Sequence, residues 1–394
     1  MLNRSKVIVI AVAASALIFS SSPAYAATLD GSGASFAAPL IDACKVDFEK
    51  ETGHKINYNA KGSGGGRSDF TGNLVDFAGS DTPYTSREPD NLIYAPIYAA
   101  PIAVFYNLPT VKESIYLAPA TIAKIFNGSI QNWDDKLIAA DNERKIKSPV
   151  FKTTQKKVKD KKGKTVTTTV IVLDKAGKPV IASYNETTVN IDLPKLPITV
   201  WYRTDSSGTS GVFTEFLQKA NAGANASLWP KASNNTFANA TPNNISNYFN
   251  FQGGSQSAGV SAGVVSKVGS IGYGELSFAV DAKMGIANVQ NAAGEFVSPS
   301  AAGTSSMLSG AGTILPNGTV TLDYKKPVAG AYSLGTSSYA LAYSSGKDEA
   351  TQKLVSTWFT YVLDKCPAKY PEKGFSQITG DLYNKAKERI ARIK

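Results

Sequence analysis

The segment from Trp201 to Leu217 constrains the fold most, because it joins a predicted strand to a predicted helix through a short turn of small polar residues. Ile198 to Tyr202 is apolar and rich in β-branched side chains, which predicts a buried strand. The apolar residues after Gly211 recur at the spacing of one helix face. They are Val212, Phe213, Phe216, Leu217 and Ala220. The turn between the two elements, Ser206 to Gly211, therefore lies where a helix start exposes unpaired backbone N–H groups.

This turn carries the residue types of an anion-binding site. Arg203 ends the predicted strand, and Asp205 follows two residues later. Free N–H groups, hydroxyl groups, the positive end of a helix dipole and a guanidinium group all attract an anion. An ordinary capped turn between a strand and a helix would contain many of the same residues. This segment alone leaves both interpretations open.

Three more glycine- or serine-rich turns follow predicted strands near the N-terminus: Gly31 to Phe36, Gly62 to Ser68, and Ser80–Asp81. Alternating strands and helices with short polar turns indicate an α/β fold with a mostly parallel sheet. In such sheets, ligands bind beyond the carboxyl ends of the strands. The four turns together would offer hydroxyl groups, helix-start N–H groups and one guanidinium group to a tetrahedral oxyanion. The groups are the hydroxyls of Ser35, Ser63, Ser207 and Thr209, the N–H groups of Phe36, Gly208 and Thr209, and the side chain of Arg203.

Two local expectations accompany these turns. Ser35 is placed to cap the helix that follows it, with Pro39 in the first turn of that helix. After the glycine run that starts at Gly62, a helix is expected from Arg67 to about Asn73.

Asp81 favours one oxyanion over others. A carboxylate can only accept hydrogen bonds, so it selects a ligand that still carries an O–H group. Phosphate at neutral pH has such a group, and sulfate does not. A buried carboxylate that faces sulfate would be repelled and unpaired, at a cost of several kcal/mol. Asp81 would therefore contribute both to affinity for phosphate and to the exclusion of sulfate.

Catalytic alternatives have little support in the sequence. The chain has a single histidine, His54, beside the predicted helix end at Gly53, where a surface position is expected. Without a second histidine or a cysteine pair, a zinc site is not indicated. The Ser207–Gly211 sequence does not match the nucleophile elbow of serine hydrolases, and the glycine turn at Gly62 lacks the lysine of a P-loop. Asp134–Asp135 is expected in a solvated turn.

The first residues, Met1 to Ala26, have the pattern of a signal peptide. Arg4 and Lys6 precede an apolar run that ends at Phe19, and Ala24 to Ala26 has the small residues of a cleavage site. The mature chain is therefore expected to start near Ala27 and to be exported. No cysteine precedes Cys44, so a lipid anchor is not expected.

Two further features stay open. Cys44 and Cys366 are the two cysteines of the chain. Export permits a disulfide between them, but two separate buried thiols are an equal alternative. The Ser298 to Gly312 region has small residues and is expected to be flexible.

The positive charge is concentrated in one segment. Lys147 to Lys178 holds ten lysines against two aspartates, about eight of the ten net positive charges of the chain. Since the rest is close to neutral, the composition argues against a nucleic-acid partner. Within the surrounding segment, 147–192, turn signals near Gly163 and Gly177 suggest that Val166–Leu173 pairs with Pro179–Ser183 as a hairpin. A solvated or disordered arm and a polyanion-binding arm are the alternatives for this segment.

The chain resembles the phosphate-binding proteins of high-affinity phosphate ABC transporters, which are two-lobed type II periplasmic binding proteins. The resemblance rests on five segments in the family's order, which cover the mature chain except the 147–192 insertion. They are Gly31–Pro39, Val75–Asp81, Ile125–Asp134, Arg203–Ser210 and Gly269–Tyr273.

This resemblance implies a phosphate site between two lobes. One lobe would contribute the Ser35 hydroxyl, the Phe36 N–H group, the Ser63 hydroxyl and the Asp81 carboxylate. The facing lobe would contribute Arg203, Ser207, Gly208 and Thr209, with Asp205 pairing Arg203 and holding its guanidinium group. The lobes would close around a dehydrated ligand.

The resemblance also implies a domain organisation and a function. Residues 27–100 and 298–394 would form the first lobe, and 101–297 the second, with crossings near Ala100 and Ser298. The sheets would be mixed and mostly parallel, with the cleft between the lobes. The expected function is capture of inorganic phosphate by an exported monomer, without metal or cofactor, and delivery to a membrane ABC permease with its ATPase. The location stays open between a periplasm and a cell surface.

Two alternative functions are kept. One is a secreted phosphatase or serine hydrolase that uses Ser207 or Ser63 as its nucleophile. The other is a cell-surface protein whose basic arm, Lys147 to Lys178, binds a polyanion, and this role could coexist with phosphate binding.

Overall fold

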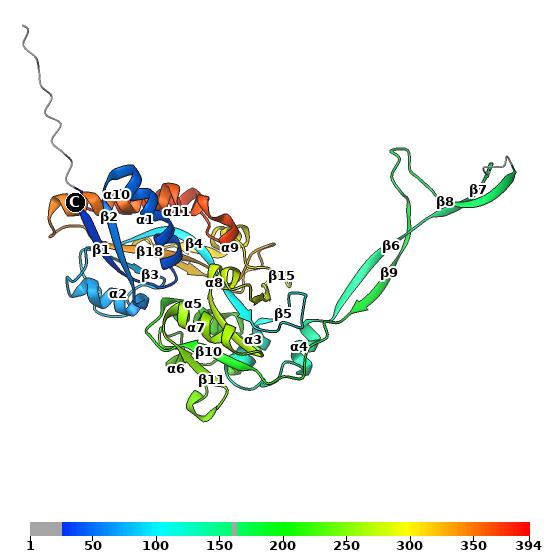
Figure 1. Ribbon diagram of the computed structural model, residues 1–394, viewed down its shortest axis with the longest axis horizontal. Helices are drawn as coiled ribbons and strands as arrows, with labels where there is room; N and C mark the ends of the chain where they lie inside the picture. The colour runs from blue at the N-terminus through cyan, green and yellow to red at the C-terminus, as the bar shows by residue number, and fades with distance from the viewer. Residues whose placement is uncertain (1–25, 160–163) are drawn as a thin grey trace, which may run out of the picture.

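The computed structural model describes residues 26–159 and 164–394. The predicted signal peptide lies outside these ranges except for Ala26, and so does the predicted turn around Gly163. The body of the protein is a mixed sheet with the strand order β11-β10-β12-β4-β18-β3-β1-β2, and β13 also pairs with β4. Figure 1 shows two lobes, with a long ribbon extending from the second. Within the described ranges, no helix is both long and apolar enough to cross a membrane.

In the first lobe, helices cover both faces of the sheet. Its strands are β1 (Thr28–Gly33), β2 (Lys55–Ala60), β3 (Phe77–Ser80), the first part of β4 (Leu92–Tyr106), and β18 (Gly335–Tyr343). Its helices are α1 (Ala38–Thr52), α2 (Gly62–Thr71), α9 (Ala301–Ala311), α10 (Glu349–Lys365) and α11 (Gly380–Ile390). Side chains alternate along β4, so that Leu92 and Tyr94 pack with α2, whereas Ile93 and Ala95 belong to the core that includes α1 and α10.

The second lobe repeats this arrangement. Its strands are the second part of β4, β10 (Thr199–Arg203), β11 (Phe251–Gly254), β12 (Ser270–Glu275) and β13 (Gly285–Ile286). Its helices are α3 (Pro119–Phe126), α4 (Lys136–Asp141), α5 (Gly208–Ala220), α6 (Phe237–Ala240), α7 (Gln256–Ser266) and α8 (Leu276–Asp281). Phe105 packs with α7 and α8, and Val104 belongs to the core of α3 and α5. A small sheet of β5 (Tyr116–Leu117), β14 (Asn288–Gln290) and β15 (Phe296–Val297) lies beside them.

Strand β4 belongs to both lobes. From Leu92 to Pro101 it pairs antiparallel with β18, and from Ile102 to Tyr106 it pairs antiparallel with β12. All fifteen of its residues are buried. The parallel pairs lie on either side of this antiparallel centre, with β1 between β2 and β3, and β10 between β11 and β12. The sheet is mixed, as predicted, but it has as many antiparallel as parallel strand pairs, so it is not mostly parallel.

Three elements start or run differently from the predictions. Helix α5 begins at Gly208, so the polar turn before it is shorter than expected. Helix α2 begins at Gly62 and not at Arg67, because the glycines let it approach other segments, as where Gly66 lies against the backbone of Gly33. The region Ser298 to Gly312, expected to be flexible, contains helix α9, capped by Ser300, whose side chain accepts a hydrogen bond from the Gly303 N–H group.

Residues 144–159 and 164–189 form a ribbon of two successive strand pairs that projects from the body (Figure 1). Strand β6 (Arg144–Phe151) pairs with β9 (Ile181–Val189), and β7 (Thr153–Lys159) pairs with β8 (Thr165–Ile171). The predicted pairing of Val166–Leu173 with Pro179–Ser183 is confirmed only at its inner end, where Leu173 and Pro179 form an isolated bridge and the Val180 N–H group donates to the Val172 carbonyl. Strand β8 pairs instead with β7, the strand that precedes it along the chain.

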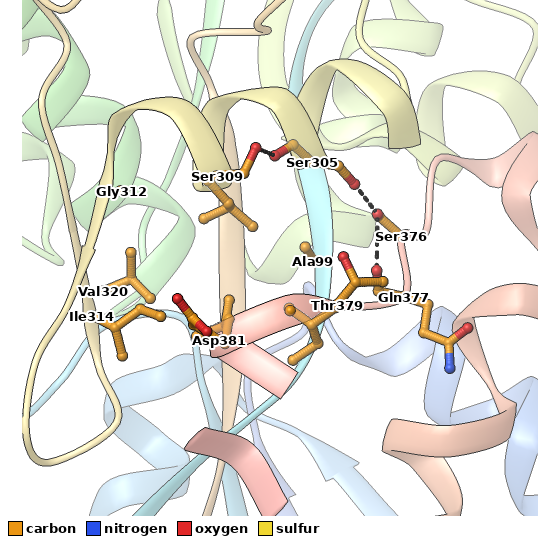
Figure 2. Close-up of a pocket in the computed structure, with 14 residues that line it drawn as sticks. Ala99, Ser305, Ser309, Gly312, Ile314, Val320, Ser376, Gln377, Thr379 and Asp381 are labelled. Atoms are coloured by element: carbon orange, nitrogen blue, oxygen red, sulfur yellow. Dashed lines mark hydrogen bonds between the residues drawn. The ribbon is translucent and has the colours of Figure 1, made fainter. Parts of the chain in front are cut away.

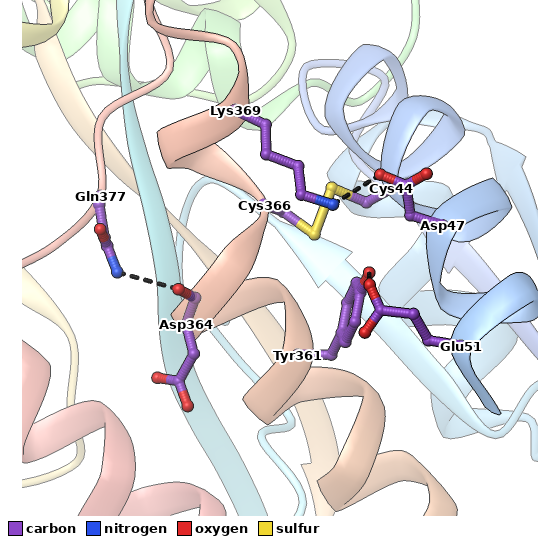
Figure 3. Close-up of a disulfide and its surroundings, with 8 residues drawn as sticks. All are labelled: Cys44, Asp47, Glu51, Tyr361, Asp364, Cys366, Lys369 and Gln377. Atoms are coloured by element: carbon purple, nitrogen blue, oxygen red, sulfur yellow. Dashed lines mark hydrogen bonds and ion pairs between the residues drawn. A yellow bond between two sulfur atoms is a disulfide. The ribbon is translucent and has the colours of Figure 1, made fainter.

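The two cysteines form a disulfide, which resolves the question that the sequence left open. Cys44 lies in α1 and Cys366 directly follows α10, 322 residues later. Figure 3 shows the bond beside the Lys369–Asp47 ion pair. Both cysteines are fully buried. The bond therefore joins the two segments of chain that build the first lobe.

Candidate functional site

Ser35 faces the second lobe and does not cap a helix. Helix α1 starts at Ala38, and its N-cap position is Ala37, with no side-chain cap, so the predicted capping role of Ser35 was wrong. The Ser35 hydroxyl oxygen instead accepts a hydrogen bond from the Ser257 N–H group at 3.1 Å, and the two hydroxyl oxygens are also 3.1 Å apart. Among the hydrogen bonds of the described chain, none uses the Phe36 N–H group, which lies in the same turn.

Asp81 and Ser63 lie next to each other in the first lobe. Asp81 follows β3, and its N–H group donates to the Ser63 hydroxyl oxygen at 3.2 Å. The Asp81 carboxylate accepts a hydrogen bond from the Ser338 hydroxyl at 2.9 Å and one from the Thr209 hydroxyl at 3.2 Å. Only 3% of Asp81 is exposed. A carboxylate has room for about four hydrogen bonds, so it can accept more than these two.

Burial raises the pKa of Asp81 from its ordinary value of 3.8 to about 6. The hydrogen bonds from Ser338 and Thr209 and the positive charges of Arg203 and Arg67 oppose this shift but do not cancel it. Above pH 6 the group is therefore a carboxylate, which accepts hydrogen bonds and donates none.

Arg203 is held in one orientation. It ends β10, is 1% exposed, and donates from Nε to Asp205 at 2.7 Å and from Nη2 to the other oxygen of the same carboxylate. Its Nη1 donates to the Ser257 hydroxyl at 3.1 Å. Three of the five guanidinium N–H groups are thus used, and two remain for another acceptor. Burial alone would raise the pKa of Asp205, but hydrogen bonding to Arg203 and its charge outweigh burial and hold that pKa below its ordinary value.

The start of helix α5 completes the site. Ser207 is the N-cap residue, and its hydroxyl oxygen accepts from the Ser210 N–H group at 3.1 Å. In the described chain, no hydrogen bond uses the N–H groups of Gly208 and Thr209, which are the first two residues of the helix. These buried donors lie at the positive end of the helix dipole.

The two lobes are in direct contact at this site. The Thr209 hydroxyl donates to Asp81 across the interface, and the Gly64 N–H group donates to the Ser206 carbonyl at 2.9 Å. A Cβ atom added to Gly208 would lie 2.4 Å from the Ser63 hydroxyl oxygen and 2.9 Å from the Asp81 Cβ. Only glycine at position 208 permits this approach of the lobes.

Two serines at the site were not predicted from the sequence. Ser257 lies in the first turn of α7 and contacts both Arg203 and Ser35. Ser338 lies in β18, which reaches Asp81 because β18 pairs with β3. Ser257 could have been predicted, because the Gly254–Ser255 sequence indicates that a helix starts directly before it. The position of Ser338 depends on a strand pairing between residues more than 250 positions apart, for which the sequence offers no local signal.

The site lacks the arrangement of a hydrolase. The Ser63 hydroxyl oxygen accepts from a backbone N–H group, and the Ser207 hydroxyl oxygen does the same as a helix cap. The one histidine of the sequence, His54, accepts a hydrogen bond from the Ala27 N–H group at the start of the first lobe. Neither serine therefore has a histidine to take its proton.

A cavity of about 470 Å³ lies elsewhere, in the first lobe (Figure 2). It is lined by α9, the hairpin of β16 (Gly312–Ile314) and β17 (Val320–Leu322), and the segment from Ser376 to Leu382. None of the predicted site residues lines it. Its polar lining, which includes Asp381 and the hydrogen-bonded hydroxyls of Ser305 and Ser376, is separate from the residues at the junction of the lobes.

Comparisons with known proteins agree with this architecture. A PBP superfamily domain matches residues 20–365. The phosphate-binding protein PstS 3 of Mycobacterium leprae is 29% identical over 345 residues, which are 84% of this chain and 77% of that protein. The phosphate-binding protein PstS of Xylella fastidiosa (strain Temecula1) is 27% identical over 342 residues, 85% of this chain and 77% of that protein.

A solved structure has the same fold. It is a high-affinity periplasmic phosphate-binding protein (PfluDING) bound with phosphate, with a TM-score of 0.62 and 18% identity, over 92% of this chain and 93% of that one. At this identity the likeness shows the fold alone. The family match extends over most of the chain, and the two lobes share one mixed sheet through β4. The chain therefore belongs to the PBP superfamily and has the fold of the type II periplasmic binding proteins.

Proposed function

We propose that this protein binds inorganic phosphate between its lobes and delivers it to a membrane ABC permease. The observation that carries the proposal is the position of Asp81, a buried carboxylate held against the N-terminus of α5 from across the interface. The relatives that share the fold are phosphate-binding proteins by name, which supports the same ligand. A helix N-terminus attracts any oxyanion, and a carboxylate in the same place restricts the choice to anions that carry a proton.

Each predicted residue has a role in this proposal. Arg203 would donate its two remaining N–H groups to phosphate, with Asp205 fixing the plane of the guanidinium group. The free N–H groups of Phe36, Gly208 and Thr209 would bind phosphate oxygens. The hydroxyls of Ser35, Ser63, Ser207 and Thr209 would add further hydrogen bonds. Asp81 would accept the phosphate O–H group.

The lobes would move about β4 to admit and release the ligand. β4 changes its pairing partner from β18 to β12 between Pro101 and Ile102, so a small change of twist there would separate the lobes. This supports the expected crossing near Ala100; the expected second crossing near Ser298 stays a prediction. Hydrogen bonds such as Gly64–Ser206 would form only on closure. Export of the chain, as its N-terminal sequence predicts, would place this site outside the cytoplasmic membrane.

Calorimetric titration tests the ligand. At pH 8, where Asp81 is ionised, we expect phosphate to bind and sulfate to bind at least about 1000-fold more weakly, since an unpaired buried carboxylate facing the anion costs several kcal/mol. In Asp81→Asn, phosphate should bind more weakly and sulfate more tightly, because the amide can donate to a sulfate oxygen. Sulfate binding as tight as phosphate binding in the wild type, or no phosphate binding, would overturn the proposal.

A further inference from the structure

The ribbon of β6, β9, β7 and β8 stands apart from the rest of the molecule. Figure 1 shows it extending away from both lobes. In the described chain, each of its strands makes its extensive contacts only with its own partner, β6 with β9 and β7 with β8. All seven residues of β7 are exposed, and β8 is mostly exposed. Isolated two-stranded ribbons are marginally stable in water, so a ribbon of this length favours a partner that covers it.

The ribbon carries a concentrated positive charge. Six of its described, exposed lysines lie along and beside β7 or near the turn around Gly177. Within the described chain, none of these six side chains has a hydrogen-bonded or ion-paired partner. They are Lys152, Lys156, Lys157, Lys159, Lys175 and Lys178. The described acidic side chains do not neutralise them. Asp174 accepts the N–H groups of Ala176 and Lys178, and Glu186 pairs with Lys145.

The outer strand pair of the ribbon, β7 with β8, also has two different faces. Directly opposite residues of an antiparallel pair share one face. One face therefore contains Val158 opposite Val166, then Lys156 opposite Thr168, then Thr154 opposite Val170. The other face contains Lys157 and Lys159 opposite threonines, then Gln155 opposite Thr169 and Thr153 opposite Ile171. The face with three valines therefore carries one lysine, whereas the opposite face carries two lysines and a single apolar side chain, Ile171.

The apolar side chains of the ribbon are unusually exposed. More than half of the large apolar side chains that are exposed in the described chain lie in this segment. They are Phe151, Val158, Val166, Ile171, Leu173, Ile181 and Tyr184. A chain that only needed to stay solvated would not require apolar residues at these positions. Apolar surface interleaved with lysine is the composition of a segment that lies at a lipid–water interface.

We propose that this ribbon binds the surface of a bilayer that contains anionic phospholipid. The lysines would contact lipid phosphate groups, and the valine-bearing face would lie at the boundary between headgroups and acyl chains. A second copy of the chain fits less well, because edge-to-edge pairing would bring two rows of lysines together. A soluble polyanion would leave the apolar face exposed. The proposal does not depend on the identity of the ligand between the lobes.

Co-sedimentation with vesicles tests the proposal. We expect binding to vesicles of phosphatidylcholine mixed with phosphatidylglycerol and little binding to phosphatidylcholine alone. Binding should fall as NaCl rises from about 0.1 M to 1 M, because the screening length falls from about 10 Å to about 3 Å. The triple variant Lys156→Gln, Lys157→Gln, Lys159→Gln should bind roughly 100-fold more weakly, at about a fivefold effect per lysine.

A matched control separates the ribbon from net charge. The variant Lys267→Gln, Lys325→Gln, Lys353→Gln removes the same charge from exposed positions on the lobes. It should bind the anionic vesicles nearly as well as the wild type. Equal weakening of the two triple variants would overturn the proposal, since the effect would then belong to total charge.

A double variant tests the role of the apolar face. Val158→Thr with Val166→Thr keeps two β-branched residues in the strands and removes apolar surface from the interface. The affinity of the double variant for anionic vesicles should be reduced relative to the wild type by a larger factor at 1 M NaCl than at 0.1 M, because the lysines contribute most at low salt. Unchanged vesicle binding, together with tight binding of the wild type to soluble polyphosphate, would show that the arm takes a polyanion and not a membrane.

Removal of the ribbon supplies the last control. Arg144 and Val189 are directly opposite each other, so a two-residue Asn-Gly turn can close the chain there. The shortened protein should lose vesicle binding and bind phosphate in calorimetry with unchanged affinity. Retention of vesicle binding would overturn the membrane proposal, whereas loss of phosphate binding alone would bear on the proposed function and not on the ribbon.

Discussion

At the scale of single residues, Asp81 couples the site to the stability of the protein. Burial raises its pKa from 3.8 to about 6, so between these values the folded state binds more protons at this residue than the unfolded state. Stability rises with pH only where the unfolded state binds more protons. At Asp81 the sign is the opposite: the carboxyl destabilises the ligand-free protein as pH rises from about 4 to about 6, and the loss persists above that range.

The change Asp81→Asn should remove this pH dependence. A shift of about two pKa units corresponds to about 3 kcal/mol in the free energy of unfolding. We therefore expect the difference in stability between Asp81→Asn and the wild type to move in favour of the variant by up to about 3 kcal/mol between pH 4 and pH 7. Denaturant unfolding in buffers free of phosphate and sulfate measures it.

Only the pH dependence of that difference is diagnostic. The asparagine NH₂ group cannot accept the hydrogen bond that Ser338 or Thr209 donates to Asp81, which adds a constant cost. A difference that does not change across this range would show that Asp81 titrates at its ordinary pKa in the folded protein.

Many residues of the site could be predicted from the sequence, because the turns that follow strands hold several of the binding groups within a few consecutive residues. Arg203, Ser207 and Thr209 belong to one turn, and their grouping follows from chain connectivity. Ser338 could not be predicted, since it meets Asp81 through the pairing of β18 with β3. Ser35 was assigned to the wrong partner, because a hydroxyl near a helix start can cap the helix or face across the interface, and only the tertiary structure decides between them.

At the scale of elements, the glycines decide how closely helices approach the opposite lobe. The start of α5 lies against Ser63 and Asp81 because Gly208 has no side chain. Glycine has a low helix propensity, so the glycine run from Gly62 suggested a loop. In the structure these glycines form the first turns of α2, where Gly64 contacts Ser206 of the second lobe. Propensity was a poor guide here because contact between the lobes requires small residues.

Gly208→Ala should hinder closure of the lobes. The added methyl group would lie 2.4 Å from the Ser63 hydroxyl oxygen and 2.9 Å from the Asp81 Cβ, and the second contact is with an atom close to the backbone. Overpacking of this kind costs about 1–3 kcal/mol, so we expect phosphate affinity to fall by roughly 10- to 100-fold. Calorimetry measures the affinity.

The stability of the ligand-free variant is the control for Gly208→Ala. Alanine is a better helix former than glycine by about 1 kcal/mol, so thermal unfolding without ligand should shift little or upward if the lobes can separate. Unchanged phosphate affinity would mean that the lobes bind the ligand without the close approach seen at Gly208.

At the scale of the whole molecule, the first lobe is assembled from the two ends of the chain. Strands β1 to β3 come from the N-terminal part, and β18, α10 and α11 from the C-terminal part. The α/β class follows from local sequence patterns, because alternating strands and helices with short polar turns indicate it. The antiparallel position of β18 between β3 and β4 has no local signal, because it is fixed by packing across the whole chain.

The Cys44–Cys366 disulfide holds these two ends together, and its removal should destabilise the protein without changing the ligand site. The bond joins α1 to the end of α10, and the hydrogen bonds that hold Asp81 and Arg203 involve neither helix. Cys44→Ala with Cys366→Ala should lower the free energy of unfolding by about 2–5 kcal/mol, because the unfolded chain is no longer closed into a loop. Alanine is chosen because both positions are fully buried and a serine hydroxyl would be unpaired.

Two measurements together decide this last prediction. Denaturant unfolding of the wild type with and without a thiol reductant should reproduce the difference between the wild type and the double variant. Calorimetry at a temperature where both proteins are folded should give the same phosphate affinity, because Asp81 and Arg203 are positioned by β3 and β10 and not by the disulfide. A fall in affinity as large as the fall in stability would show that the bond also orders the interface between the lobes. Equal stability with and without the bond would show that packing of α1 against α10 alone holds the ends of the chain.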